Sequence, residues 1–467
     1  MFRAVPPAPN TPVSAAPPSA ACPVGTRRFA QAVAMLRPRW NRRVGNRGNV
    51  RRNAPWIQMN DIRKAAAWCA WICVCGCSEP ADRRANTISR DSAGIEVVEA
   101  GSPTWDADRG WYLEALPSLS IGREEGDPDY LFNRIRGVRR LADGRIVLAD
   151  GGSSQIRFFD PSGVHLKTVG GAGGGPGEFR FIGSMWSYAA DSLVVTDLAG
   201  ISFMDSQGTF ARRPVVELAQ KQHRGNPVGQ VIEGPLLVVS GTRGFSPADA
   251  GTVIRDSLRF FWYHPSGSFG GPLVVLPSAE RWGLQVGGVT SFPYVPFSPN
   301  PIWTVAGDRF YIGAGRRPEV AIWRPDGSLE RLLRWPKAER PVKEALKEQL
   351  RTFTLESAED ANERRREERF LAETPIAERL PSYQSMLVDE EGNLWLEEYR
   401  PFWELESSWD VLTSGGQWLG AVSMAARFTP YQIGAHFVLG VTRDEVGVER
   451  VESFALVKDA RGRSPSK

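Results

Sequence analysis

Short turns followed by apolar runs recur six times along the chain. Each stretch has a Gly, Asp or Asn and then alternating or continuous apolar residues, the pattern of a tight turn that leads into a buried strand. We therefore predict a hairpin at each of them. The six stretches are ADGRIVLAD (142–150), ADSLVVTD (190–197), EGPLLVVSG (233–241), GDRFYIGA (307–314), EGNLWLEE (391–398) and GAHFVLGV (434–441).

A second hairpin follows five of the six stretches: an apolar strand end, a short turn that closes at a glycine, and a returning strand. The sixth unit ends with VESFALVK (451–458) and has no returning partner. Two hairpins per unit make a four-stranded antiparallel sheet, and six units predict an all-β, six-bladed β-propeller. The five second hairpins are RFFDPSGVHL (157–166), SFMDSQGTF (202–210), FWYHPSGSF (261–269), AIWRPDGSL (321–329) and DVLTSGGQWL (410–419).

The missing strand is expected from the other end of the chain. The segment 113–135 aligns with the stretch around LKTVGGAGGGPGEF (166–179), and Phe132 matches Phe179 in this alignment. Both segments read as an outer strand, a connector rich in Gly and Pro, and the inner strand of the next sheet. The N-terminal strand is thus predicted to close the ring, so that the first and last sheets expose no edge.

The glycine-rich run does not fit a nucleotide-binding loop, because Gly175 precedes Pro176 instead of the Lys-Ser/Thr that such a loop requires. It resembles an NHL repeat, in the GPGEF connector, the DGRIVLAD strand and the RFFDPSG hairpin, over residues 137–180. The whole of 93–458 resembles uncharacterised bacterial six-bladed propeller lipoproteins. The resemblance implies a fold and little chemistry, because such propellers include both binding modules and enzymes.

One segment breaks the β pattern. Residues 337–380 are charged and helical in pattern, and Leu346, Leu350 and Phe353 form one apolar stripe. We predict a helical insertion between blades four and five, packed on the propeller through this stripe.

Composition changes the meaning of the net charge of +4. Residues 1–58 hold ten arginines and no Asp or Glu, whereas beyond Cys77 the 45 basic and 52 acidic residues leave a net charge of about −7. The body is mildly acidic and lacks the basic footprint of a nucleic-acid-binding protein.

Residues 59–77 have the layout of a bacterial export signal, with Arg63 and Lys64 before a short apolar stretch that ends at Cys77. The run VCGC resembles a lipobox, so Cys77 is the expected lipidation site, with plain signal cleavage or an N-terminal anchor as alternatives. Residues 1–58 are then a mis-annotated start or a disordered segment, 78–92 a linker and 459–467 a tail. These features predict a protein that is exported to the bacterial cell envelope and touches the membrane only through a lipid anchor.

The long loops between second and third strands, and the connectors between sheets, fall on one face of the predicted propeller. This loop face is the expected ligand site. The guanidinium groups on this face could bind carboxylates of a ligand. The alternative is that they pair with Glu319, Glu397 and Glu445 of the protein itself, and that Trp403 serves only in packing. The candidate binding residues are Arg136, Arg243, Arg316, Arg317, Arg400, Trp403 and Arg443.

The leading hypothesis is a module that binds a protein, peptide or saccharide, with no cofactor, no metal and no catalytic residues. The alternative is a metal-dependent propeller hydrolase or lactonase, which would need Ca²⁺ held by carboxylates and amides in the central channel. Asp150 and Asp197 end their predicted strands near that channel, but two acids do not make a site. An assembly scaffold is a third hypothesis, and it would expose a large apolar patch.

Overall fold

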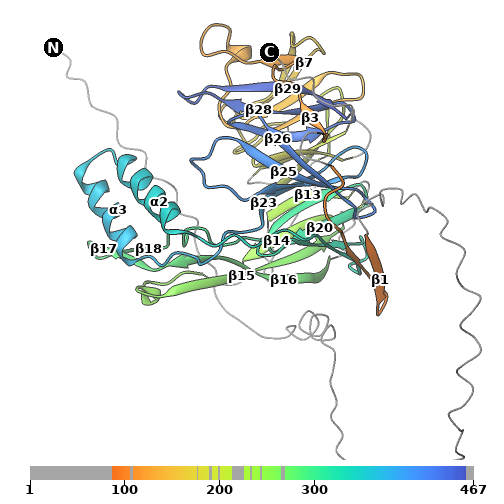
Figure 1. Ribbon diagram of the computed structural model, residues 1–467. Coiled ribbons are helices and arrows are strands. Elements are labelled where there is room, and N and C mark those ends of the chain that lie inside the picture. The colour runs from red at the N-terminus through yellow and green to blue at the C-terminus, as the bar shows by residue number, and fades with distance from the viewer. Residues whose placement is uncertain are drawn as a thin grey trace, which may run out of the picture. The chain divides into compact units, whose positions relative to one another are not determined.

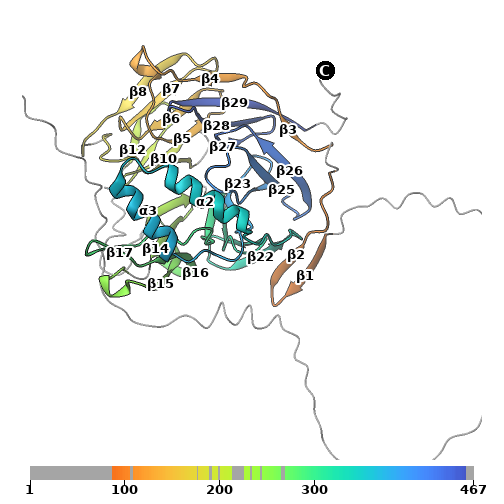
Figure 2. The same ribbon diagram turned by 60° about the vertical axis from the view of Figure 1, so that its left-hand side comes forward.

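The computed structural model describes residues 87–105, 109–175, 177–188, 192–197, 200–212, 226–231, 234–241, 244–264 and 269–458. This part of the chain is built mainly of strands, with two α-helices and two short 3-10 turns, η1 (Pro128–Tyr130) and η2 (Pro247–Asp249). The strands form consecutive antiparallel sheets, most of them four-stranded, in the manner of a β-propeller (Figures 1 and 2). The N-terminal 86 residues, which include Cys77, lie outside the described residues.

The first three sheets each pair four strands in chain order. The first sheet comprises β5 (Ile135–Arg140), β6 (Ile146–Asp150), β7 (Gln155–Phe159) and β8 (His165–Gly170). The second comprises β9 (Ser184–Ser187), β10 (Leu193–Asp197), β11 (Gly200–Met204) and β12 (Phe210–Arg212). The third comprises β13 (Asn226–Gln230), β14 (Leu236–Gly241), β15 (Val253–Tyr263) and β16 (Phe269–Trp282).

The next three sheets repeat this order, and the last has only three strands of its own. The fourth comprises β19 (Ile302–Ala306), β20 (Arg309–Gly313), β21 (Glu319–Trp323) and β22 (Leu329–Arg334). The fifth comprises β23 (Tyr383–Val388), β24 (Leu394–Glu398), β25 (Ser407–Leu412) and β26 (Trp418–Met424). The last comprises β27 (Phe428–Ile433), β28 (Phe437–Arg443) and β29 (Glu449–Val457).

Strands from the N-terminal end of the described chain complete two of these sheets. β4 (Leu119–Ile121) pairs antiparallel with β29, and β3 (Tyr112–Leu113) pairs with the end of the same strand. β2 (Ile95–Glu99) lies parallel to β22, and β1 (Ile88–Ser92) pairs with its outer edge. β1 thus falls in the segment read from the sequence as a linker, and the parallel addition of β2 to the fourth sheet was not predicted.

Alternation along the second strands builds the core, because successive side chains of a strand point to opposite faces. In β6, Val147 belongs to the buried cluster that contains Leu193 of the second sheet. Its neighbour Leu148 belongs to the cluster that contains Leu439 of the last sheet. The strand β6 is therefore covered on both faces, which explains its nearly continuous apolar sequence.

Two helices, α2 (Glu344–Glu356) and α3 (Ala361–Glu373), lie between β22 and β23, within the segment expected to be helical (Figure 2). Asp360 caps α3, because its Oδ1 accepts hydrogen bonds from the backbone N–H groups of Asn362 and Glu363 at 2.7 and 2.8 Å. In α2, Leu350 is buried and Phe353 stacks on Trp403, with ring centroids 5.7 Å apart. Two members of the apolar stripe thus make tertiary contacts, and Phe353 meets the loop between β24 and β25.

Two of the long loops expected on the loop face are partly strand. β15 begins at Val253 and β16 runs to Trp282, and these two residues pair at the end of an extended ribbon. A small hairpin, β17 (Leu284–Val286) with β18 (Val289–Ser291), follows it. The predictions of loop over 240–257 and 277–300 were wrong for these parts. Val253 is exposed and Ile254 is buried, an alternation typical of a strand with one covered face.

Candidate ligand-binding site on the loop face

A cavity of about 490 Å³ opens beside the loop that follows β20. Arg316 and Arg317 come from this loop, and the two stems of the helical segment form the opposite wall. We call this cavity the basic groove, because cations outnumber carboxylates in its lining. The cationic lining residues are Arg255, Arg316, Arg317, Lys337, Arg340 and Arg379, and the acidic ones are Glu280, Glu339 and Glu378.

Several of the groove's cations are already neutralised. Lys337 Nζ lies 2.7 Å from Oε2 of Glu398 and 2.5 Å from Oδ2 of Asp410. Arg340 Nη1 lies 2.6 Å from Oε1 of Glu398. Two further ion pairs join Arg255 to Glu280 and Arg379 to Glu339. These four cations therefore have counter-charges within the protein.

Arg316 and Arg317 differ from their neighbours in this respect. Within the described residues neither guanidinium forms an ion pair or a side-chain hydrogen bond, and Glu319, one of their expected partners, pairs with Arg334 at 2.6 Å. Burial, followed by the charge of Arg316, lowers the pKa of the Arg255 guanidinium. The positive charges of Arg255 and Arg316 thus lie close enough to repel each other, which an anion in the groove would relieve.

Arg136 and Arg443 lie together in a different place, around the innermost strands β5 and β27. Arg443 Nη2 lies 2.6 Å from Oε1 of the buried Glu449, whose other oxygen accepts a 2.7 Å hydrogen bond from the N–H of Ile135. The pKa of Tyr431 is raised, mainly by burial, and the positive charges of Arg443 and Arg136 act in the opposite direction. The loop-face arginines were expected to line one channel mouth. They lie instead in two places, the basic groove and this inner cluster.

Arg400 and Trp403 are held by their neighbours. Arg400 Nε lies 3.1 Å from Oε1 of Glu397, and its Nη1 donates to the carbonyl of Glu404. Trp403 packs against Phe402 and the α2 residue Phe353. Both side chains therefore have structural contacts that account for them. Arg243 lies outside the described residues.

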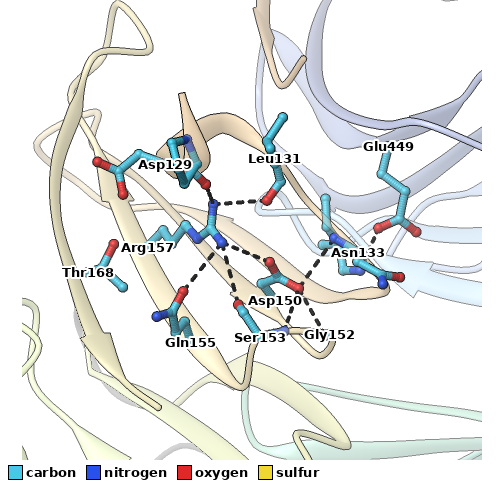
Figure 3. Close-up of polar contacts among 12 residues, drawn as sticks. Asp129, Leu131, Asn133, Asp150, Gly152, Ser153, Gln155, Arg157, Thr168 and Glu449 are labelled. Carbon is cyan, nitrogen blue, oxygen red and sulfur yellow. Dashed lines mark hydrogen bonds and ion pairs between the residues drawn. The ribbon is translucent and has the colours of Figure 1, made fainter. Parts of the chain in front are cut away.

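Asp150, weighed above as a channel carboxylate, is instead a buried hub of the first sheet (Figure 3). Its Oδ2 lies 3.1 Å from Nη2 of Arg157, and its Oδ1 accepts from the N–H groups of Gly152 and Ser153. Among the residues that the structure describes, no group of three or more His, Cys, Asp or Glu is placed to hold a metal ion. The Asp150 carboxylate itself is thus engaged by an arginine and by two backbone N–H groups.

An apolar cavity of about 680 Å³ lies between the helices and the segment before β19. Leu350, Phe353 and Phe370 line it from the helices, and Phe297 and Phe402 from the loops. Burial raises the pKa of Glu367, at the rim of this cavity. None of the sequence-predicted site residues lines it. In the described part of the chain, no helix is long and apolar enough to cross a membrane.

No protein-family model and no curated protein matches the sequence. Solved structures with a similar backbone include a member of the DUF4221 family from Bacteroides vulgatus, at 11% identity and a TM-score of 0.45, covering 75% of this chain and 99% of that one. A virginiamycin B lyase from Staphylococcus aureus has 9% identity and a TM-score of 0.34, covering 73% and 99%. A gluconolactonase from Xanthomonas campestris has 11% identity and a TM-score of 0.36, covering 74% and 100%. The function proposed below rests on the geometry of this chain.

Two arginines that the sequence analysis did not select contribute to these sites. Arg255 lies in β15, inside a run read as a loop, and pairing with β16 brings it to the basic groove. Arg139 lies in β5 and donates to the backbone carbonyl of Tyr431. Neither has a sequence signal of its own, because both depend on which strands become neighbours.

Proposed function

We propose that this protein binds a carboxylate-bearing segment of a protein, peptide or saccharide in its basic groove. The observation that carries the proposal is that Arg316 and Arg317, two consecutive residues without an ion pair among the described residues, both line a cavity of about 490 Å³. A guanidinium group can bind a carboxylate through two parallel hydrogen bonds. It therefore recognises a carboxylate with more geometric specificity than the ammonium group of a lysine, which acts as a point charge.

The surroundings support binding over a purely structural role. The neighbouring cations each have an internal partner, so Arg316 and Arg317 are the cations of the described lining without one, and the lining also holds one carboxylate without an ion pair, Glu378. The loop that carries them follows a strand that is buried in the sheet, and a rigid strand under a loop is a usual support for a binding residue. The volume is within the range of small-molecule and peptide side-chain pockets, about 300 to 1,000 Å³.

The scaffold of this proposal is an NHL-like propeller of six blades, closed by the N-terminal strand. The antiparallel pairing of Ile121 in β4 with Val451 in β29 supports closure. So does the buried cluster that joins Leu148 to Leu439, because it packs the first sheet against the last. Ring closure would hold the loop face rigid and leave no free sheet edge.

The protein is proposed to act at the bacterial cell envelope, anchored through Cys77. The support is the order of charge, apolar stretch and VCGC in residues 59–77, which is the layout of an export signal ended by a lipobox-like sequence. A binding module in that compartment would meet envelope peptides and acidic saccharides, both of which carry carboxylates.

The experiment is a comparison of two immobilised proteins, the wild type and the double variant Arg316→Gln/Arg317→Gln, in extracts of the native envelope. The proposal expects one or more carboxylate-bearing components to be retained by the wild type and lost by the variant, with both proteins showing the same melting temperature. Equal retention by the two folded proteins would remove the basic groove from the function.

A further inference from the structure

Four of the innermost strands carry an irregularity at a corresponding place. The register shifts between Ile135 and Gly137 in β5, between Pro227 and Gly229 in β13, between Tyr383 and Ser385 in β23, and between Pro430 and Gln432 in β27. One residue of each strand is left without a direct cross-strand partner: Arg136, Val228, Gln384 and Tyr431. A β-bulge of this kind turns one side chain away from the regular alternation, and bulges are common beside functional sites.

Three of these extra residues, Arg136, Val228 and Tyr431, line one cavity. This axial cavity, of about 360 Å³, is lined by residues of the inner strands β5, β9, β13, β19 and β27. The bulge in β5 also explains how Arg136 and Arg139, three residues apart, both line it, since residues at that spacing on a regular strand point to opposite faces. The described lining contains these two arginines and several hydroxyl groups, but no Asp or Glu.

Arg139 has hydrogen-bond partners but no ion pair among the described residues. Its Nη1 donates to the carbonyl oxygens of Val138, at 3.1 Å, and Tyr431. Burial lowers the pKa of this guanidinium to about 10, against smaller raising effects of Tyr431 and of the charge of Glu390. A partly buried charge without an ion-pair partner costs free energy, and an anion in the cavity would offset part of that cost.

Arg136 is the second cation of this cavity. Its guanidinium lies over the ring of Phe181, 5.5 Å from the centroid, and no hydrogen bond or ion pair of its side chain is found among the described residues. A stacked guanidinium keeps its edge available for a planar oxyanion. Two guanidinium groups thus line one cavity whose described lining contains no Asp or Glu.

We propose that the axial cavity is a binding site for a small organic dicarboxylate, one that meets the guanidinium groups of Arg136 and Arg139. This site is separate from the basic groove, because the two cavities share no lining residue. It therefore stands or falls independently of the proposed function.

The test is isothermal titration calorimetry of the purified full chain with sodium succinate and sodium citrate, at constant ionic strength set with sodium chloride. Saturable binding below about 10 mM is expected for succinate or for citrate, a dicarboxylate and a tricarboxylate, with acetate weaker by roughly tenfold because it can engage only one guanidinium group. Inorganic phosphate is the comparison that separates carboxylate from phosphate recognition, and phosphate binding without succinate or citrate binding would overturn the assignment of ligand class.

The variants assign the binding to the cavity. Arg139→Gln and Arg136→Gln are each expected to weaken the binding by roughly tenfold or more, the loss of a charge-assisted pair. Arg450→Gln is the matched control, since Arg450 is half-buried and paired with Asp444 outside the cavity, and it should bind as the wild type does. If Arg139→Gln does not fold, Arg136→Gln decides the matter, because its side chain makes no hydrogen bond among the described residues. Undiminished affinity in the folded variants, or no saturable binding by the wild type, would refute the site.

Discussion

Nη2 of Arg157 lies 3.1 Å from Oδ2 of Asp150, and both side chains are almost completely shielded from solvent. The same guanidinium donates through Nη1 to the carbonyls of Pro128 and Leu131, at 2.7 and 3.0 Å (Figure 3). The pair thus ties the connector before β5 to the second and third strands of the first sheet. It is a structural ion pair inside the motif that resembles an NHL repeat.

Replacing Arg157 with Leu should destabilise the protein by about 3–5 kcal/mol, because it leaves the buried Asp150 carboxylate without a partner. Urea unfolding followed by tryptophan fluorescence measures the loss. Arg145→Leu is the matched control: its pair with Asp143 has one half-exposed member, and its removal should cost about 0–1 kcal/mol. Equal losses for the two variants would contradict the role given to the buried pair.

Deleting residues 93–121 should lower the stability of the whole fold. The deletion removes β2 and β4 with the buried side chains of Val97, Val98 and Ile121, each worth about 1.5–3 kcal/mol. Differential scanning calorimetry should show one transition at a much lower temperature. Deleting only 88–92, whose strand β1 is largely exposed, should change the melting temperature little. An unchanged melting temperature after the longer deletion would argue against ring closure by the N-terminal strand.

The turn between β21 and β22 should make stability depend on acid pH. Oδ1 of Asp326 accepts hydrogen bonds from Oγ and N–H of Ser328, at 2.7 and 2.8 Å, and these bonds lower the pKa of the carboxyl group. A carboxyl whose pKa is lower in the folded protein stabilises it above the unfolded value, about 3.9, and this contribution is lost as the pH falls through the folded value. The stability difference between wild type and Asp326→Asn should therefore shrink from pH 5 to about pH 2.5.

Melting curves across this range check the prediction. Ser328→Ala removes the largest cause of the shift, so its stability should begin to fall at a higher pH than that of the wild type. Parallel pH profiles for all three proteins would show that this turn contributes nothing to the acid sensitivity.

The chain's regular features could be predicted from the sequence because they are local. Each of the six turn-and-strand stretches contains all or most of the second strand of a sheet, from β6 at Ile146–Asp150 to β28 at Phe437–Arg443. A buried strand flanked by tight turns can be recognised from a short stretch of sequence, without knowing which distant residues it contacts. The same holds for the helical segment, where a stripe through Leu350 was visible.

The unpredicted features depend on contacts between distant residues. β2 reads as a short strand, but nothing in its sequence specifies a parallel partner more than two hundred positions away. The extension of β15 and β16 was read as long loops between predicted strands, and only the pairing of Val253 with Trp282 shows that both segments are strand there. Arg136 was selected from the sequence, whereas Arg139 was not. The bulge that brings both to one cavity is a property of strand pairing and has no local signature.

Mass spectrometry of the mature N-terminus tests the proposed export. The protein isolated from its native cells should begin at Cys77 and carry a diacylglycerol on the thiol, because VCGC resembles a lipobox. Cys77→Ser should remove the lipid and release the protein from the membrane fraction. A cytosolic, unmodified chain that begins at Met1 would contradict export and the anchor together.

The most direct test of the central claim is the affinity of the basic groove for carboxylates. Fluorescence anisotropy with labelled hexaglutamate and with labelled oligogalacturonate measures it, using the wild type, Arg316→Gln/Arg317→Gln, and the control Arg364→Gln/Arg366→Gln. The control removes the same charge from exposed positions of α3 that do not line the groove. We predict that the wild type and the control bind at least one of the two probes with equal affinity, and that this affinity falls as salt is added. The groove variant should bind the same probe at least roughly tenfold more weakly. Equal affinity of all three proteins, or no binding of either probe by the wild type, would contradict the account.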